Sequence, residues 1–500
     1  MPIVSLGSLA SVGGLGAALV GAWVLYFFVS SVYYAFFHSL AKVPGPKLYA
    51  FWDLPHLYYL VRGEWPQKLK QLHDEYGPVV RITHRHVSFI TPGAWKTIYG
   101  HRSVGQESFQ KDRVSYRPTR SGHPHIIVAN DADHRRQRRL LSHAFSEKAL
   151  RGQEDIMKHY VDLFLAKLTE KARAGETIDI VRWYNFTTFD LIGDLAFGQP
   201  FECLTSGDYH PWIAMIFNNI KLGVYIEVLR RHPSLDILKT LLVPKKLVRS
   251  QLEHLALSEQ TAKRRLANAD VTREDFMSYI LRHNDEKGMS EGEIVENAQL
   301  LIIAGSETTA TQLSGTTFYL LKNPDKYDRL VREIRDTFKR EEDITLLEVN
   351  KLEYMLAVFE EGFRMYPPAP LALPRVTPPK GEYVEGYWIP GDTTVSVPQW
   401  AAYQSESNFR NPQKFAPERW LGDPEYDHDV RAVLQPFSVG PRNCIGKNLA
   451  YAEMRLILAR LLWNFDLELI PESRNWNDQK IYVLWQKGAI NVKLTPVSRD

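Results

Sequence analysis

A short loop near the C-terminal end of this 500-residue chain carries its most informative cysteine. Residues 437–446 read Phe437-Ser438-Val439-Gly440-Pro441-Arg442-Asn443-Cys444-Ile445-Gly446. Two glycines and a proline predict a tight, irregular loop whose backbone can approach a ligand closely. Cys444 lies just before an expected helix, whose first N–H groups and dipole favour a negatively charged sulfur, and Arg442 adds a cation nearby. We therefore expect a lowered pKa for the Cys444 thiol.

The residues alone leave three interpretations of Cys444 open. A thiolate held in such a loop can act as a nucleophile or as a metal ligand, and a buried, inert cysteine is the ordinary alternative. The chain has 2 cysteines, Cys203 and Cys444, and only the second lies in such a loop. A zinc site would need more Cys and His ligands close by. So few cysteines also indicate a reducing compartment rather than a disulfide framework.

The N-terminal segment is expected to be a membrane anchor. No Asp, Glu, Lys or Arg occurs before Lys42, and residues 15–37 are mostly apolar. A membrane-spanning helix needs about 20 such residues. A cleaved signal peptide, the competing interpretation, would have a basic start and a shorter apolar run. Lys42 and Lys47 favour the cytosolic side for the rest of the chain, and Pro44-Gly45-Pro46 ends the helix. We expect an anchor over residues 1–41 and one globular domain over residues 42–500.

The globular part is expected to be mainly helical with a minor β-rich lobe. Ser290 and Glu293 form a capping box that begins a long helix, which continues until Asn323-Pro324. Alternating β-branched residues predict a hairpin over residues 78–83 and 86–91. Further helices are expected at 325–338, 352–365 and 446–463, and strand-like pieces at 383–397 and 481–494.

Composition excludes little beyond nucleic acid. Hydrophobic residues make up 44% of the chain and charged residues 24%, as in ordinary globular proteins. The net charge of +3 gives no reason to expect a nucleic-acid partner, so electrostatic docking would need a local patch.

The cysteine loop resembles, at every defined position, the F-x-x-G-x-R-x-C-x-G haem-binding loop of the cytochrome P-450 family. Phe437, Gly440, Arg442, Cys444 and Gly446 fill its five positions. The resemblance implies haem b, iron protoporphyrin IX, with the Cys444 thiolate as iron ligand. It also implies that Arg442 pairs with a haem propionate and that Phe437 packs by the cysteine.

Two further motifs are similar to the family's buried triad. Glu361 and Arg364 match E-x-x-R, and Arg419 lies in Pro417-Glu418-Arg419-Trp420, which resembles P-E-R-F. The resemblance implies that Glu361, Arg364 and Arg419 hold the cysteine loop in place. An ordinary surface salt bridge is the alternative for the first pair. Trp420 stands where Phe is usual, and we expect no consequence from it.

The long helix contains Ala304-Gly305-Ser306-Glu307-Thr308-Thr309, which resembles A-G-x-(D/E)-T-T. Thr308 can bond back to the Ala304 carbonyl. A glycine inside a helix lowers its stability, so we do not expect packing alone to explain Gly305. The resemblance implies a groove for oxygen, with Glu307 as the link to solvent and Thr308 holding a proton-carrying water.

A basic run covers residues 134–139, His-Arg-Arg-Gln-Arg-Arg. By itself it would be a solvated helix face. The resemblance implies that His134, Arg138 and, further along, Arg375 contact the haem propionates. Four side chains are expected to form a face that docks an acidic reductase: Arg135, Arg136, Arg139 and Lys447.

These resemblances imply a monooxygenase with electrons from NADPH through NADPH-cytochrome P-450 reductase. The substrate is expected to be a lipophilic small molecule, such as a polyketide, terpenoid or alkaloid of fungal secondary metabolism. Its pocket is expected to be lined from 104–125, 204–242, 299–307, 370–373 and near Leu484. The anchor implies the endoplasmic reticulum membrane, with the catalytic domain in the cytosol. A haem-thiolate isomerase or dehydratase and a non-catalytic haem sensor remain as alternatives.

Overall fold

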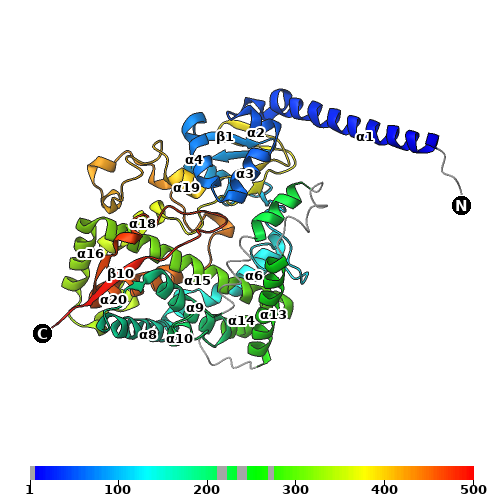
Figure 1. The fold of residues 1–500 in the computed structure, drawn as a ribbon. Coiled ribbons are helices and arrows are strands. Elements are labelled where there is room, and N and C mark those ends of the chain that lie inside the picture. Colours follow the sequence, from blue (N-terminus) through cyan, green and yellow to red (C-terminus); the bar gives the residue numbers. More distant parts are fainter. Residues whose placement is uncertain (1–5, 211–221, 233–244, 268–274, 286, 500) are drawn as a thin grey trace.

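The computed structural model describes residues 6–210, 222–232, 245–267, 275–285 and 287–499. A helical body and a smaller β-containing lobe make up most of it, and the helix α1 projects away from both (Figure 1). The expected fold class, mainly α with a minor β-rich lobe, is confirmed. The described helices are α1 (Leu6–Val32), α2 (Lys47–Phe51), α3 (Leu54–Arg62), α4 (Trp65–Tyr76), α5 (Pro92–Tyr99), α6 (Asp131–Ala144), α7 (Glu147–Gly152), α8 (Glu154–Arg173), α9 (Ile180–Phe197), α10 (Cys203–Ser206), α13 (Lys245–Ala267), α14 (Phe276–His283), α15 (Glu291–Lys322), α16 (Pro324–Thr337), α17 (Leu346–Val349), α18 (Glu353–Met365), α19 (Gln399–Tyr403) and α20 (Lys447–Asn464).

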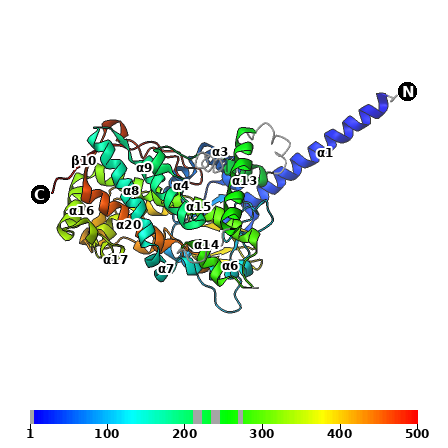
Figure 2. The same ribbon diagram turned by 90° about the horizontal axis from the view of Figure 1, so that it is seen from below.

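Helix α15 is the centre of the helical body. Its 32 residues begin at the expected capping box, since the Ser290 hydroxyl accepts from Glu293 N–H and the Glu293 carboxylate accepts from Ser290 N–H. Most of its residues are buried along its whole length, as expected for a helix that crosses a domain. Helices α9, α13, α18 and α20 pack against it, and α6 and α14 lie near its N-terminal half (Figure 2).

The described part of the chain also contains three small sheets. The largest has the strand order β1-β2-β8-β5-β3, with the expected hairpin between β1 (Val79–Thr83) and β2 (His86–Phe89). Its other strands are β8 (Thr394–Ser396), β5 (Arg375–Val376) and β3 (Gln110–Lys111). The second sheet joins β4 (Ile178–Asp179), β10 (Asn491–Pro496) and β9 (Phe465–Leu469), and the third pairs β6 (Glu382–Val384) with β7 (Tyr387–Ile389). We did not expect the strand β9. It follows the helix α20 directly, and its residues alternate between buried and exposed.

The N-terminal helix fits the expected anchor in length and composition. Residues Gly14–Phe37 form an apolar helical stretch of 24 residues. Only 6% of its most apolar 18-residue segment is buried against the rest of the protein. Its last turn, Tyr33–Phe37, is π-helical and touches the domain, because Arg81 Nη1 donates to the Tyr34 carbonyl at 2.8 Å. The Pro44-Gly45-Pro46 turn packs on β1, where a Cβ on Gly45 would lie 2.4 Å from the Arg81 carbonyl. The boundary near residue 42 is therefore a packed turn.

Candidate active site

A cavity of about 310 Å³ lies between α15, α6, the end of α18 and the cysteine loop. The structure brings seven of the expected site residues to its wall: Cys444, Arg442, Arg375, Arg138, His134, Phe437 and Thr308. Glu307, Gly440 and Gly446 do not line it. The wall takes residues from the expected ranges 104–125, 299–307 and 370–373, and none from Leu484 or from the described part of 204–242. Residues 211–221 and 233–244 of that range lie outside the described residues.

The cysteine loop is closed by its own backbone. Cys444 N–H donates to the Phe437 carbonyl at 2.8 Å, which brings both residues to the cavity wall. Phe437 packs edge-on against Phe363 of α18, with 5.2 Å between ring centroids. At Gly440 the backbone has φ +76°, and a Cβ would lie 2.0 Å from the Tyr99 carbonyl, so no other residue fits there. A Cβ on Gly446 would meet only Phe145 at 3.8 Å, so the surrounding protein does not explain that glycine.

The expected lowering of the Cys444 pKa is wrong for the protein alone. Burial raises the pKa of the thiol, although the Gly446 N–H and the cations Arg138 and Lys447 act in the opposite direction. The sulfur opens onto the cavity while lying deep in the protein. A positively charged iron at the sulfur would provide the charge that favours the thiolate.

Several basic side chains share the wall of the cavity. Arg442 Nη2 donates to the Ala129 carbonyl and to Asp131, both at 2.8 Å, while its buried Nη1 has no partner among the described residues. Arg138 binds the cysteine loop itself, through the Asn443 carbonyl at 2.5 Å and side-chain Oδ1 at 2.8 Å. Arg375 stacks over the Tyr99 ring at 5.2 Å. Each of these guanidiniums is therefore held in place by neutral groups or by one carboxylate.

Two more basic groups complete this cluster, and the sequence did not indicate one of them. Burial, together with Arg442 and Lys111, lowers the pKa of His134 to about 4. Lys111 lines the cavity because β3 pairs with β5, in the register Lys111 with Arg375. Its pKa is lowered well below the ordinary value by burial and then by Arg375 and Arg442.

The basic cluster fits an anionic cofactor. Among the described residues no Asp or Glu lines the cavity, and Asp131 binds Arg442 from outside it. The neighbouring arginines lower the pKa of His134 and Lys111, and a buried N–H of Arg442 has no partner among the described residues, so this part of the wall favours a ligand with negative charge. Haem has two carboxylates on one edge and an iron that takes a thiolate ligand. Cys444 therefore suits the iron at the centre of a haem group, and the basic cluster suits the carboxylates on its edge.

The expected triad of Glu361, Arg364 and Arg419 is present and fully buried. Arg364 binds both carboxylate oxygens of Glu361, at 2.8 and 2.9 Å, and Arg419 Nε donates to the same carboxylate at 3.2 Å. All three side chains are 0% exposed, so the surface salt bridge alternative is excluded. Arg364 also donates to the Tyr403 carbonyl at 3.1 Å, and the Tyr403 hydroxyl accepts from Gln435 N–H just before the cysteine loop.

Two members of this network were missed. Asp429 accepts from Arg419 Nη1 at 2.6 Å, so two carboxylates balance two guanidiniums. Trp420 Nε1 donates to Glu361 Oε2 at 3.0 Å, a bond that phenylalanine cannot make. The expectation that Trp420 has no consequence is therefore wrong.

The acid–hydroxyl pair of α15 is split between two faces of the helix. The Thr308 hydroxyl donates back to the Ala304 carbonyl at 2.6 Å, as expected, and Thr308 lines the cavity. Glu307 does not line the cavity, is 0% exposed and binds Lys487. We expected Glu307 to be the link to solvent, but its own side chain does not reach solvent. Gly305 has a packing reason after all, because a Cβ there would lie 2.7 Å from Ile192 of α9.

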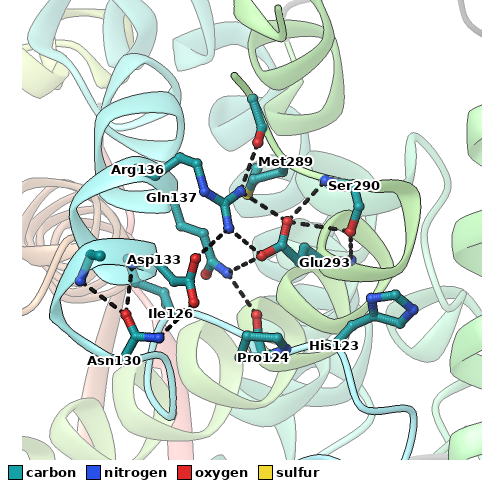
Figure 3. A network of polar contacts seen from close by, with 12 residues as sticks. His123, Pro124, Ile126, Asn130, Asp133, Arg136, Gln137, Met289, Ser290 and Glu293 are labelled. Atoms are coloured by element: carbon teal, nitrogen blue, oxygen red, sulfur yellow. Dashed lines mark hydrogen bonds and ion pairs between the residues drawn. The ribbon is translucent and has the colours of Figure 1, made fainter. Parts of the chain in front are cut away.

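The residues of the basic run on α6 also differ in their surroundings. Arg136 binds both oxygens of Glu293, at 2.6 and 2.9 Å, and the carbonyl of Gly288, so it joins α6 to the start of α15 (Figure 3). Gln137 adds a bond to the Pro124 carbonyl at 2.6 Å in the same network. Arg136, whose side chain is 28% exposed, is therefore held at this junction, and its place on the docking face stays a prediction. Arg135, Arg139 and Lys447 are exposed.

A cysteine loop facing a cavity, a basic cluster on the wall of the same cavity and a buried acid–arginine network together define a haem-thiolate protein of mainly helical fold. Comparison with known proteins gives the family. A family profile described as "Cytochrome P450" matches residues 43–494. The chain is 46% identical over 498 residues to "Cytochrome P450 monooxygenase aclL" of Aspergillus oryzae, covering 99% of each chain. The chain belongs to the cytochrome P450 family, and it is a haem-binding monooxygenase.

Two relatives carry names that describe a reaction. The chain is 45% identical over 469 residues to the "Trichothecene C-4 hydroxylase" of Trichoderma arundinaceum, covering 92% of this chain and 93% of the relative. It is 42% identical over 482 residues to the "Averantin hydroxylase" of Dothistroma septosporum, covering 95% and 90%. The similarity spans nearly the whole length of each protein.

Proposed function

We propose that this enzyme inserts one oxygen atom into a lipophilic small molecule of fungal secondary metabolism, with electrons from NADPH through NADPH-cytochrome P450 reductase. The observation that carries the proposal is the presence of Cys444 and Thr308 on the wall of one cavity. Much of the remaining wall is apolar, as a lipophilic substrate requires: Ile126, Ile127, Leu300, Leu301, Ala304, Ala369 and Leu373. The named hydroxylases among the relatives support the same reaction class.

Haem supplies the activation of dioxygen when it is bound, and the residues of this chain hold it and manage protons. Cys444 would hold the iron through its thiolate. The basic cluster would hold the two carboxylates: Lys111, His134, Arg138, Arg375 and Arg442. Phe437 and Gly440 shape the loop that presents the sulfur. The Glu361 network stabilises the segment that leads into that loop.

Thr308 is proposed to hold a proton-carrying water at the cavity wall, with Glu307 behind it as the acid. A hydroxyl whose own hydrogen bonds to Ala304 still offers its lone pairs to water. Proton delivery of this kind distinguishes a monooxygenase from a haem-thiolate isomerase or a haem sensor, neither of which needs it. The acid–hydroxyl pair therefore favours the monooxygenase over both alternatives.

Electrons are proposed to enter beside the cysteine loop. Arg138 ties α6 to Asn443 of that loop, so the exposed Arg135 and Arg139 of α6 lie near the sulfur side of the cavity, with Lys447 just after the loop. Exposed cations of this kind suit an acidic partner. The apolar helix Gly14–Phe37 suits an anchor in the endoplasmic reticulum membrane, with residues 42–500 as the cytosolic catalytic domain.

The test of the proposed function is Thr308→Ala in the enzyme with its reductase. We expect unchanged haem content and reduction, continued NADPH consumption, more hydrogen peroxide and less product per NADPH. Loss of a positioned proton donor typically costs about 100-fold or more in the step that it serves. A Thr308→Ala enzyme that forms product with unchanged efficiency would overturn the proton-delivery role.

Cys444→Ser is the companion test of the ligand assignment. The variant should lose the far red-shifted Soret band that reduced thiolate haem gives with carbon monoxide, because a neutral hydroxyl cannot replace the thiolate. Cys203 is buried and its backbone N–H binds Asp190 away from the cavity, so Cys203→Ser should keep that band. A thiolate spectrum in Cys444→Ser would place the ligand elsewhere.

A further inference from the structure

A buried ion pair joins α15 to the loop before β10, and none of the roles above uses its lysine. Lys487 Nζ binds Glu307 Oε1, and the two side chains are 3% and 0% exposed. Thr311, one turn along α15, completes the group. Its hydroxyl accepts from Lys487 Nζ at 2.6 Å and donates to Glu307 Oε1 at 3.2 Å. The acid of the acid–hydroxyl pair is thus held by a cation that lies 180 positions away in the chain.

The second oxygen of this carboxylate is not used by the ion pair. Glu307 Oε2 is buried and accepts no hydrogen bond from any group in the described parts of the chain. Tyr366 and Tyr209 also face Glu307, and burial raises the pKa of both, to about 12 for Tyr209. Both phenols are therefore neutral at ordinary pH and add no charge beside Glu307. In these contacts the charged partner of Glu307 is Lys487.

Lys487 connects this buried site with the surface. Its neighbours Gln486 and Gly488 are exposed, so the backbone of the loop is at the surface while the ammonium group is buried. Burial lowers the pKa of Lys487, against the opposing effect of Glu307. The four-carbon stem of lysine is flexible, so a change of its rotamer is the movement that would bring the ammonium group from Glu307 to solvent.

We propose that Lys487 is a positioning residue that relays protons from solvent to Glu307, which rests on the proposed proton-delivery function. The proton moves from Nζ to Oε1 and leaves a neutral amine beside a neutral acid. This transfer removes two buried charges, which lowers its cost inside the protein. Glu307 then passes a proton on toward the water at Thr308, one residue along the helix, and regains its negative charge. The Lys487 amine takes its next proton from solvent at the loop.

The alternative is that the ion pair only stabilises the fold, and Lys487→Arg separates the two roles. Arginine keeps the positive charge and can bind a carboxylate with two hydrogen bonds, but it does not release its proton in proteins. A structural role predicts that Lys487→Arg behaves as the natural enzyme. The relay predicts that Lys487→Arg binds haem and is reduced normally, yet wastes NADPH.

The experiment measures product per NADPH, peroxide and the solvent deuterium isotope effect on turnover in Lys487→Arg. The relay predicts a fall of about tenfold in product per NADPH, smaller than the loss of a direct general acid because water can partly replace it, and a larger isotope effect. The exposed Lys493 of the adjacent strand is the control, and Lys493→Met should match the natural enzyme. Unchanged coupling and isotope effect in Lys487→Arg would overturn the relay.

A second variant decides the question if Lys487→Arg fails to hold haem. The variant Lys487→Gln leaves Glu307 in place and keeps a neutral N–H donor for Glu307 and Thr311, but it carries no proton to pass on. The relay predicts poor coupling in this variant, and coupling at the natural level would overturn it. Thr308→Ala is measured in parallel. Poor coupling there with normal coupling in the Lys487 variants overturns the relay alone, whereas normal coupling in Thr308→Ala overturns the proposed proton delivery.

Discussion

Two clusters of charged side chains lie inside this protein, one behind α18 and one at the cavity. In the first, the carboxylates of Glu361 and Asp429 meet the guanidiniums of Arg364 and Arg419, and every ion pair is closed. In the second, Lys111, Arg138, Arg375 and Arg442 share the cavity wall with His134, and no described acid faces them there. The first cluster is electrically complete by itself, whereas the second has an excess of positive charge.

This difference separates a structural cluster from a binding cluster. Burial would raise the pKa of Glu361, but Arg364 and Arg419 lower it, so the carboxylate stays charged with its partners already in place. In the cavity, burial and neighbouring cations lower the pKa of both His134 and Lys111. A protein maintains such an arrangement at a cost to its own stability, and an anionic ligand relieves it. Removing a charge should therefore have opposite effects in the two clusters.

The largest effect is expected from Glu361→Ala. It leaves two guanidiniums buried beside each other without their shared carboxylate, and breaking a buried pair in this way costs about 3–5 kcal/mol. We expect little folded, haem-containing protein, measured by haem content and thermal unfolding. Glu348 pairs with Lys351 at the surface, and Glu348→Ala should change stability by less than about 1 kcal/mol. Equal stability of the two variants would contradict the structural role.

Trp420→Phe tests whether the complete cluster needs its neutral donor. The change keeps an aromatic ring but removes the hydrogen bond to Glu361 Oε2. Hydrogen bonds to charged groups contribute about 1.5–3 kcal/mol, so a lower unfolding midpoint is expected with an unchanged haem spectrum. Trp388 is 44% exposed, which makes Trp388→Phe the matched control. A Trp420→Phe protein as stable as the natural one would show that the donor is dispensable.

Features set by local sequence could be predicted, and features set by long-range contacts could not. The capping box at Ser290, the β1–β2 hairpin and the ends of α18 and α20 depend on neighbouring residues, and each was predicted to within one or two positions. The cysteine loop and the Thr308 bond to Ala304 are local as well. A pattern of residue types is sufficient for features of this kind.

The missed site residues reach the site through contacts between distant segments. Lys111 faces the cavity because β3 pairs with β5, and Lys487 meets Glu307 across 180 positions. The basic run gives no sign that Arg136 binds Glu293, because that contact depends on how α6 packs against the start of α15. The pKa of Cys444 was predicted in the wrong direction because burial, which depends on the whole fold, outweighs the local N–H group.

Lys111→Met tests the binding cluster and should act in the opposite direction to Glu361→Ala. Removing one of several mutually repelling cations should leave the haem-free protein as stable or more stable. It should also weaken haem binding by about tenfold, since one charge-assisted hydrogen bond is lost. Thermal unfolding without haem and the rate of haem transfer to a competing haem-binding protein measure the two effects. Lys96 is exposed, and Lys96→Met should change neither quantity. A less stable haem-free protein would mean that Lys111 is structural.

The smallest effect on stability is expected from replacing exposed cations that belong to neither of the two buried clusters. Arg139 lies 3.7 Å from Asp285, with both side chains more than half exposed, and Arg135 is exposed one turn earlier on α6. Replacing both with Glu should leave the unfolding midpoint unchanged, because surface charges of this kind contribute little. If the reductase docks here, reduction should slow by about tenfold at low salt, and the difference should shrink as salt screens the charges.

The control for this last variant reverses two exposed cations of α13, Arg249 and Lys263. The α13 variant carries the same change in net charge, so it separates a local docking effect from a general one. Arg136 is unsuitable for the test, since a glutamate there would face Glu293 and disturb the junction of α6 and α15 (Figure 3). Equal reduction rates in the α6 and α13 variants would move the docking site away from α6. A lower unfolding midpoint in the α6 variant would instead mean that Arg135 or Arg139 belongs with the structural cations of this helix.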